Sequence, residues 1–411
     1  MIPAMFKAEW RPKHQLSLYG KKMDITEQFT GEQRMIMSMV RQFSRDVVAA
    51  DAAVRDRNRE FPAAILRQMG ALGLMGMMIP FEYNGSGADT VAYVLALSEI
   101  AYSCASTAVV MSVQNSIICE SLYRFGTEGQ KERFLKPLAA GDIIGAFGLT
   151  EPQAGSDPLG QSATAVREGD HFVINGTKRF ITSGKNSGVV IVTAKTDPSK
   201  RHQGISAFIV PKKTPGLAVG REEEKLGLRA SDTTDLIFED CRVPADQMLG
   251  REGEGFGIAM KALDGGRIGI AAQSIGVAQA ALDAAVRYSS SRFQFGQPLS
   301  KFQGLRWMIA EMATEIEAAR QLTLSAAGMK DRGENFTTTA SMAKLYASEM
   351  ANRITAKALQ IHGGYGYTRE YPVERFYRDA RVFTIYEGSS EIQKIVISNN
   401  IYNDRRVTRY I

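Results

Sequence analysis

The chain has 411 residues, about two to three times the usual size of one domain, so we expect two or three packed units and not a small stapled scaffold. Hydrophobic residues make up 44% and charged residues 23%, which excludes a disordered or coiled-coil chain. The formal net charge is +6, but the basic residues are scattered, which argues against a nucleic-acid partner. Positive charge clusters only in the C-terminal tail, at Arg405, Arg406 and Arg409, and we interpret this tail as a solvated terminus.

The N-terminal sequence and the number of cysteines indicate the cellular compartment of the protein. Residues 1–25 lack both the apolar core of a signal peptide and the Ser and Arg richness of a transit peptide, so we interpret them as a mobile cytoplasmic arm. The three cysteines, Cys104, Cys119 and Cys241, cannot pair evenly, which indicates a reducing compartment. No run of about 18 uncharged apolar residues occurs, so we expect no membrane span.

Residues 26–145 are predicted to form an N-terminal helical domain. Apolar residues recur there at helical spacing, as at Met37, Val40, Ile65 and Met69. The apolar stretch 105–122 is expected to be buried on most sides.

Residues 146–256 change to short β-rich runs and are predicted to form a middle β domain. The runs are 171–174, 189–193, 205–210 and 235–238. Between two of them stands Asn175-Gly176, a dipeptide typical of a tight type I′ hairpin, so we predict a hairpin there.

Residues 257–411 return to helical periodicity and are predicted to form a C-terminal helical domain with a tail. Long helices are expected over 256–292, 302–332 and 337–362, and such helices bury their apolar stripes only against one another, as in an antiparallel bundle. The predicted fold class is therefore α+β, mostly α.

Several kinds of site are excluded by missing patterns. The four histidines are neither paired at helical spacing nor near a cysteine pair, so no metal site is predicted. No phosphate-binding loop of the G-x-x-x-x-G-K-[ST] type and no G-x-S-x-G nucleophile motif occurs. The glycine clusters at 253–257 and 363–366 do not have the spacing of a Rossmann dinucleotide site.

Two longer segments are more specific. Residues 148–160, GLTEPQAGSDPLG, are rich in small and hydroxyl residues that can present N–H and O–H groups to phosphate, although a plain domain-boundary turn would have a similar composition. The second segment runs from 360–367, QIHGGYGY, through Arg375 and Asp379, to 385–393, IYEGSSEIQ.

Together these segments resemble the two signatures of the FAD-dependent acyl-CoA dehydrogenases, most closely the short-chain, butyryl-type members, and the resemblance extends over about residues 26–400. It implies an N-terminal helical domain, a middle β-barrel or sandwich and a C-terminal four-helix bundle. It also implies a homotetramer that binds FAD, oxidises an acyl-CoA substrate and passes electrons to an electron-transferring flavoprotein.

Glu387 is the predicted catalytic base. The α-proton of an acyl thioester is weakly acidic, so its removal needs a desolvated carboxylate, and Glu387 follows the apolar stretch 382–386, where burial would raise its pKa. Some family members carry the base instead on a C-terminal helix, but the matching position here is Gly266. The β-hydride would pass to flavin N5, giving a 2-enoyl-CoA.

The resemblance also implies binding residues. The matched FAD positions, several of them reaching a neighbouring subunit's cofactor, are Phe147, Leu149, Thr150, Ser156, Phe180, Thr182, Arg292, Phe295, Gln303, Gln360, Gly363, Gly364, Ser389 and Glu391. The matched substrate positions are Ser156, Gln114, Phe256, Asp264, Arg267 and Gly388. For Asp264 and Arg267 an intrahelical ion pair is the alternative.

The acyl group is less well defined. Residues 263–271, LDGGRIGIA, resemble short-chain members, while branched and alicyclic acyl groups stay open, and Gln114 could add a polar group to the pocket wall. Ala108 stands where glutaryl-type members place an Arg, which disfavours a dicarboxylic acyl group. Two further hypotheses are a flavin monooxygenase or oxidase on the same fold, and a non-catalytic helical protein that binds acyl-CoA.

Overall fold

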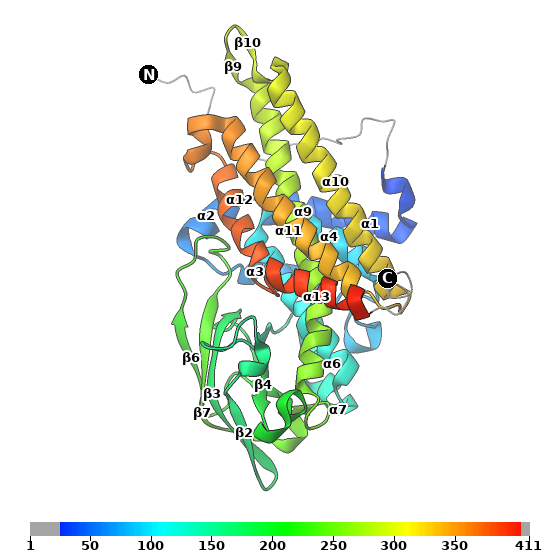
Figure 1. Ribbon diagram of the computed structural model, residues 1–411, viewed down its shortest axis with the longest axis vertical. Coiled ribbons are helices and arrows are strands. Elements are labelled where there is room, and N and C mark those ends of the chain that lie inside the picture. The colour runs from blue at the N-terminus through cyan, green and yellow to red at the C-terminus, as the bar shows by residue number, and fades with distance from the viewer. Residues whose placement is uncertain (1–24, 404–411) are drawn as a thin grey trace.

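The computed structural model describes residues 25–403, and it consists of a helical region, a β region and a second helical region in that order along the chain (Figure 1). The predicted mostly helical α+β class is confirmed. Nearly all of the predicted N-terminal arm, and the arginines of the basic tail, lie outside the described residues.

The first helical region begins with a well-capped helix. Thr30 Oγ1 accepts a hydrogen bond from the Gln33 N–H at 3.2 Å, and the Gln33 side chain accepts one from the Thr30 N–H at 3.0 Å, a capping box that fixes the start of α1. The α-helices are α1 (Gly31–Phe43), α2 (Ala52–Asn58), α3 (Ala63–Ala71), α4 (Thr90–Ser103), α5 (Ala105–Ser112), α6 (Glu120–Phe125), α7 (Glu128–Gln130) and α8 (Lys136–Ala139). Short 3-10 and π segments join them: η2 (Ile25–Gln28), η3 (Ser44–Val48), η4 (Phe81–Tyr83), η5 (Val113–Cys119) and η6 (Lys131–Leu135). The stretch 105–119 is buried throughout, as expected from its composition.

The middle region is a sheet with the strand order β6-β7-β3-β2-β4-β5-β8, and β1 adds to β4 in parallel. The strands are β1 (Gly145–Gly148), β2 (Thr164–Glu168), β3 (His171–Thr182), β4 (Val189–Lys195), β5 (Ile205–Pro211), β6 (Leu217–Glu222), β7 (Thr233–Pro244) and β8 (Met248–Leu249). Three 3-10 segments connect them: η7 (Pro158–Gly160), η8 (Pro198–Gly204) and η9 (Ala245–Gln247). β4 and β5 are buried along nearly their whole length, so they form the centre of this region's core.

The predicted hairpin at Asn175-Gly176 is wrong. β3 continues through this dipeptide, which forms a bulge where the register with β7 shifts between Ile174 and Gly176. Gly176 is required because its φ is 141° and a Cβ there would lie 2.7 Å from the Cβ of Ala163 on the neighbouring chain segment. The tight turn lies earlier, at Gly169 and Asp170, between the paired residues Glu168 and His171.

The C-terminal region contains the three predicted long helices, within about one residue of the expected ends: α9 (Gly255–Ser291), α10 (Gln303–Asp331) and α11 (Thr337–His362). They run side by side along the long axis of the molecule, and α9 also packs against α4 (Figure 1). Shorter elements complete the region: β9 (Phe293–Gln294), β10 (Gln297–Pro298), η10 (Leu299–Lys301), η11 (Gly363–Tyr367), α12 (Val373–Ala380), η12 (Arg381–Thr384) and α13 (Ser390–Asn403).

α9 is the central helix of the molecule. Among the described residues it alone is long and apolar enough to cross a membrane by composition, yet 94% of its most apolar 18-residue window is buried inside the protein. Packing on all sides therefore accounts for its lack of a polar face.

Candidate active site

Glu387 lies in a turn of unusual backbone conformation between η12 and α13. Its φ is 52° and that of Gly388 is 90°, so two successive residues adopt the left-handed region. The carbonyl of Gly388 accepts hydrogen bonds from the Lys344 ammonium at 2.7 Å and from the Gln393 amide at 2.9 Å. The Gln393 amide also donates to the Glu387 carbonyl at 3.2 Å. These bonds hold the turn in a conformation that an isolated peptide would rarely adopt.

The carboxyl group of Glu387 points at the backbone of α9. A Cβ built on Gly266 would lie 1.9 Å from its Oε2 atom, which is buried and has no hydrogen-bond partner among the described residues. Burial raises the pKa of Glu387 to about 7, and the cations Lys344 and Arg267 partly oppose that rise. A half-buried carboxyl with one inaccessible, unpartnered oxygen and this pKa can accept a proton near neutral pH.

Arg267 and Asp264 form an ion pair within α9, which was the alternative left open by the sequence. Asp264 also accepts a hydrogen bond from Thr337 Oγ1 at 2.7 Å, and Arg267 is almost fully buried with its Nε atom unpartnered. The guanidinium therefore belongs to the electrostatic surroundings of Glu387, and its contact with a substrate stays a prediction.

A second group of predicted residues gathers where β1 leaves the sheet beside β3. Phe147 lies in β1, and Thr150 follows it and accepts a hydrogen bond through its carbonyl from the Arg179 N–H at 2.8 Å. The register of β3 shifts between Lys178 and Ile181, and Phe180 has a φ of 58°. This bulge leaves the Phe180 ring 58% exposed, with the Arg179 guanidinium 5.0 Å from its centre. An exposed aromatic face beside half-buried Leu149, Thr150 and Thr182 fits a flat aromatic ligand.

The loop that carries Ser156 is held by a buried ion pair that the sequence analysis did not identify. Lys178 donates to Glu151 Oε1 at 2.7 Å and to the Leu149 carbonyl at 3.1 Å. Glu151 also accepts from the Ala163 N–H at 3.0 Å. Burial lowers the pKa of Lys178 to about 8, while Glu151 opposes that change. Ser156 itself is exposed, and Phe256 is half-buried in the first turn of α9.

A third group lies at the other end of α9. A cavity of about 490 Å³ is lined by Arg292, Gly363 and Gly364, among others, and the Arg292 guanidinium lies 5.6 Å from the centre of the Tyr365 ring. Nearby, Phe295 at the tip of the β9–β10 hairpin is 91% exposed, and Gln303 and Gln360 are exposed. Arg292 follows Gly266 by 26 residues of helix, which is about 39 Å at 1.5 Å per residue, so this group cannot reach Glu387 of the same chain.

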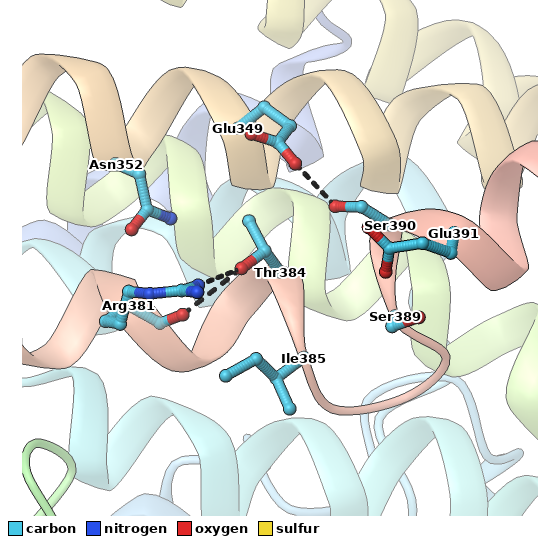
Figure 2. A pocket seen from close by; sticks show the side chains of 8 residues that line it. All are labelled: Glu349, Asn352, Arg381, Thr384, Ile385, Ser389, Ser390 and Glu391. Atoms are coloured by element: carbon cyan, nitrogen blue, oxygen red, sulfur yellow. Dashed lines mark hydrogen bonds between the residues drawn. The ribbon is translucent and has the colours of Figure 1, made fainter. Parts of the chain in front are cut away.

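Ser389 and Glu391 line a further cavity of about 310 Å³ between α11, η12 and the start of α13 (Figure 2). Figure 2 shows Glu349 reaching from α11 to Ser390, whose hydroxyl donates to it at 2.6 Å, and Arg381 turned toward Thr384, with an Nη1 to Oγ1 distance of 2.5 Å. The sequence analysis did not identify the remaining lining residues, which are Glu349, Asn352, Arg381, Thr384, Ile385 and Ser390. The i, i+3 spacing of Glu349 and Asn352 places both on one face of α11, but only the fold shows which element faces them.

Gln114 does not offer a free polar group to a pocket. Its side chain is fully buried, and its amide donates to the carbonyls of Leu138 at 2.7 Å and Ile143 at 3.1 Å. Its Oε1 accepts from the Gly145 N–H at 2.9 Å. The prediction of a polar pocket wall is therefore corrected: Gln114 ties η5 to the start of β1, because buried polar groups must be satisfied and backbone groups do so here.

Family models match three consecutive parts of the chain. They describe the N-terminal domain of acyl-CoA dehydrogenase over residues 30–142, the middle domain over 146–241 and the C-terminal domain over 253–402. The chain therefore belongs to the acyl-CoA dehydrogenase family.

Individual proteins place it more narrowly in that family. The chain is 49% identical over 373 residues to a short-chain specific acyl-CoA dehydrogenase of Clostridium acetobutylicum, covering 91% of this chain and 98% of that one. The butyryl-CoA dehydrogenase structure from Megasphaera elsdenii has a TM-score of 0.90 and 44% identity, covering 93% of this chain and all of that one. A chain from structural work on the electron transferring flavoprotein of Acidaminococcus fermentans has a TM-score of 0.91 and 46% identity, with 93% of this chain and 100% of that one covered. The chain is thus an oxidoreductase of the short-chain, butyryl type.

Proposed function

We propose that this enzyme oxidises the α,β bond of a short-chain acyl-CoA to the 2-enoyl-CoA, with Glu387 removing the α-proton. The observation that carries the proposal is the Glu387 side chain, whose Oε2 atom is buried without a hydrogen-bond partner and whose pKa of about 7 suits a general base. A carboxylate that loses its remaining water when a substrate enters becomes a stronger base, which favours proton removal. Gly388 and the turn around it orient the carboxylate.

FAD is the cofactor that we propose, and when bound it accepts the β-hydride. The exposed ring of Phe180 offers a face for the flavin ring system, and Phe147, Leu149, Thr150 and Thr182 lie beside it at the edge of the sheet. We propose that Ser156, Ser389 and Glu391 bind other parts of the cofactor or substrate, together with Phe256 and the Asp264–Arg267 pair at the CoA portion.

We propose a small acyl group because the face of α9 beside Glu387 is closely packed. A Cβ on Gly269 would lie 2.3 Å from Ser112 Oγ and 2.7 Å from the hydroxyl of Tyr93, so α4 and α5 pack closely against this face of α9. The charge of Glu387 contributes to the raised pKa of Tyr93, which indicates that this phenol is near the carboxylate. Tight packing here favours a short linear chain over a bulky branched or alicyclic group.

We further propose a homotetramer in which Arg292, Phe295, Gln303, Gln360, Gly363 and Gly364 bind a neighbouring subunit's FAD. The distance along α9 supports this, because these residues lie too far from Glu387 to serve the same site within one chain.

An electron-transferring flavoprotein is the proposed acceptor, in line with the similar chain from work on such a protein. Three free, buried cysteines support a reducing, cytoplasmic location.

The test is an anaerobic titration of the purified holoenzyme, followed by the visible flavin band. We expect butyryl-CoA to bleach the band faster than a branched short acyl-CoA or cyclohexanecarboxyl-CoA. Glu387→Gln is the matched control: it should still bind flavin and acyl-CoA but reduce at least about 10³-fold more slowly, because an amide accepts no proton. Full reduction by this variant would remove Glu387 from the mechanism, and a band that reoxidises in air at an enzymatic rate would favour an oxidase.

A further inference from the structure

Lys344 is a buried cation that the reaction as described does not use. It lies in the first third of α11, and its side chain is completely inaccessible. Its ammonium donates to the Gly388 carbonyl at 2.7 Å and forms no ion pair within the described part of the chain. An ammonium group without a paired carboxylate is costly to bury, so its surroundings must compensate for the charge.

The compensation comes from the turn that carries Glu387. The Gly388 carbonyl accepts from both Lys344 and Gln393, so two donors from two helices converge on one peptide group. That peptide follows directly on Glu387, whose left-handed φ of 52° aims the carboxyl at α9. The ammonium is therefore bonded to the backbone of the turn while its charge acts on the carboxylate one residue away.

We propose that Lys344 is a positioning residue that acts on the base through its charge: held beside Glu387 by its bond to the Gly388 carbonyl, the ammonium favours the ionised form of Glu387 before the substrate enters. The proposal rests on the proposed role of Glu387 and adds to it a cation on a different helix.

Of the two cations that act on Glu387, Lys344 is the one whose charge is not paired with a carboxylate. From α9, Arg267 faces the carboxyl but is paired with Asp264. From α4 and from the turn itself, Tyr93 and Tyr386 contribute phenols whose pKa values are raised by burial, so both are neutral at pH 7. Among the charges that act on Glu387, that of Lys344 lowers its pKa more than that of Arg267 does.

The lysine itself stays charged at neutral pH. Burial lowers the pKa of Lys344 to about 8, and the carboxylates of Glu387, Glu349 and Glu391 oppose that change while Arg267 adds to it. Above about pH 8 the cation is lost, so its influence on Glu387 is confined to neutral and acidic pH.

The test is the pH dependence of flavin reduction by butyryl-CoA in Lys344→Met holoenzyme, measured in single turnovers. Removing a cation that favours the carboxylate raises the pKa of Glu387. The acid limb of the curve of reduction rate against pH should therefore move up by about one pH unit. Reduction should then slow by about 5- to 10-fold at pH 6.5 and stay within about twofold of wild type at pH 9. Lys357→Met is the matched control, because it removes a lysine of the same helix that pairs with Glu311 and Glu315 of α10, away from Glu387.

A second readout does not depend on turnover. The infrared C=O stretch of protonated Glu387, assigned by its disappearance in Glu387→Gln, should titrate at higher pH in Lys344→Met. Lys344→Gln keeps a donor for the Gly388 carbonyl but no charge, so it should shift the titration as well, and it replaces the Met variant if that variant does not fold.

An unchanged infrared midpoint, or a reduction rate lowered equally at every pH, would overturn the proposal and leave Lys344 a purely structural residue. If the wild-type flavin is not reduced by any acyl-CoA, the proposed function fails, but the infrared titration still decides the role of Lys344.

Discussion

At the scale of single residues, Glu387 and Gly266 depend on one another. The carboxyl Oε2 of Glu387 occupies the volume that any side chain at position 266 would need. A base on α9 at this position and a base in the turn before α13 are therefore mutually exclusive in this packing.

Gly266→Ala tests this contact. The methyl group would displace the Glu387 carboxyl, so we expect flavin reduction to slow by about 10²-fold, since a misplacement of about 1 Å is enough for such a loss. Thermal stability should change little, because alanine favours the helix by about 1 kcal/mol and offsets part of the strain. Gly257→Ala, at a position on α9 with open space around it, is the control and should reduce at the wild-type rate. A wild-type rate of flavin reduction in Gly266→Ala would show that the Glu387 carboxyl does not need this position to remove the proton.

The sequence identified Glu387 because it stands in a recognisable segment. Lys344 and Gln393 were missed because a lysine in a helical pattern looks like a solvent-exposed residue, and only the fold brings it to a carbonyl 44 positions later. Gln114 was misassigned for the related reason that its backbone partners, Leu138, Ile143 and Gly145, lie well beyond it in the sequence.

At the scale of elements, the long helices were predictable and the strand details were not. The bounds of α9, α10 and α11 follow from long helical periodicity, the most reliable local signal. Asn175-Gly176 has the composition of a hairpin turn, but Gly176 instead lets β3 pass close to Ala163. Composition indicates that a residue with positive φ is needed, and long-range packing decides whether it forms a turn or a bulge. The domain limits at 145 and 256 stay predictions.

Gly176→Ala measures what the bulge contributes. Its φ of 141° and the contact with Ala163 predict a loss of about 1–3 kcal/mol in the free energy of unfolding, read from denaturant or thermal transitions. Gly129→Ala, in α7 with nothing nearby, is the comparison and should be neutral or slightly stabilising. If the two variants unfold alike, the bulge does not constrain this position.

At the scale of the whole molecule, the predicted binding residues fall into separate groups. Arg292 follows the last turn of α9, next to the β9–β10 hairpin at one end of the molecule (Figure 1), whereas Gly266, which faces Glu387, lies 26 residues earlier on that helix. Sequence order gave no sign of this separation, because Arg292 and Gly363 stand between Gly266 and Glu387 along the chain. The separation is what a shared site between subunits requires.

Arg292→Ala tests that arrangement. Loss of the guanidinium that we propose binds a neighbouring subunit's FAD should lower flavin occupancy of the purified protein by at least about tenfold at limiting FAD, with the oligomeric state unchanged in light scattering. Lys301→Ala, an exposed cation nearby in η10, should keep its flavin. Equal flavin content in the two variants would contradict the assignment.

α9 also limits how this chain can change in length. Each residue inserted into or deleted from it between Gly266 and Arg292 would shift one end by about 1.5 Å and rotate it by about 100° relative to the other. Such a change would turn either Gly266 away from the Glu387 carboxyl or Arg292 away from the cavity that it lines. Loops elsewhere can lengthen or shorten without this consequence, so related chains that differ in length should differ outside this segment and keep its 26-residue spacing.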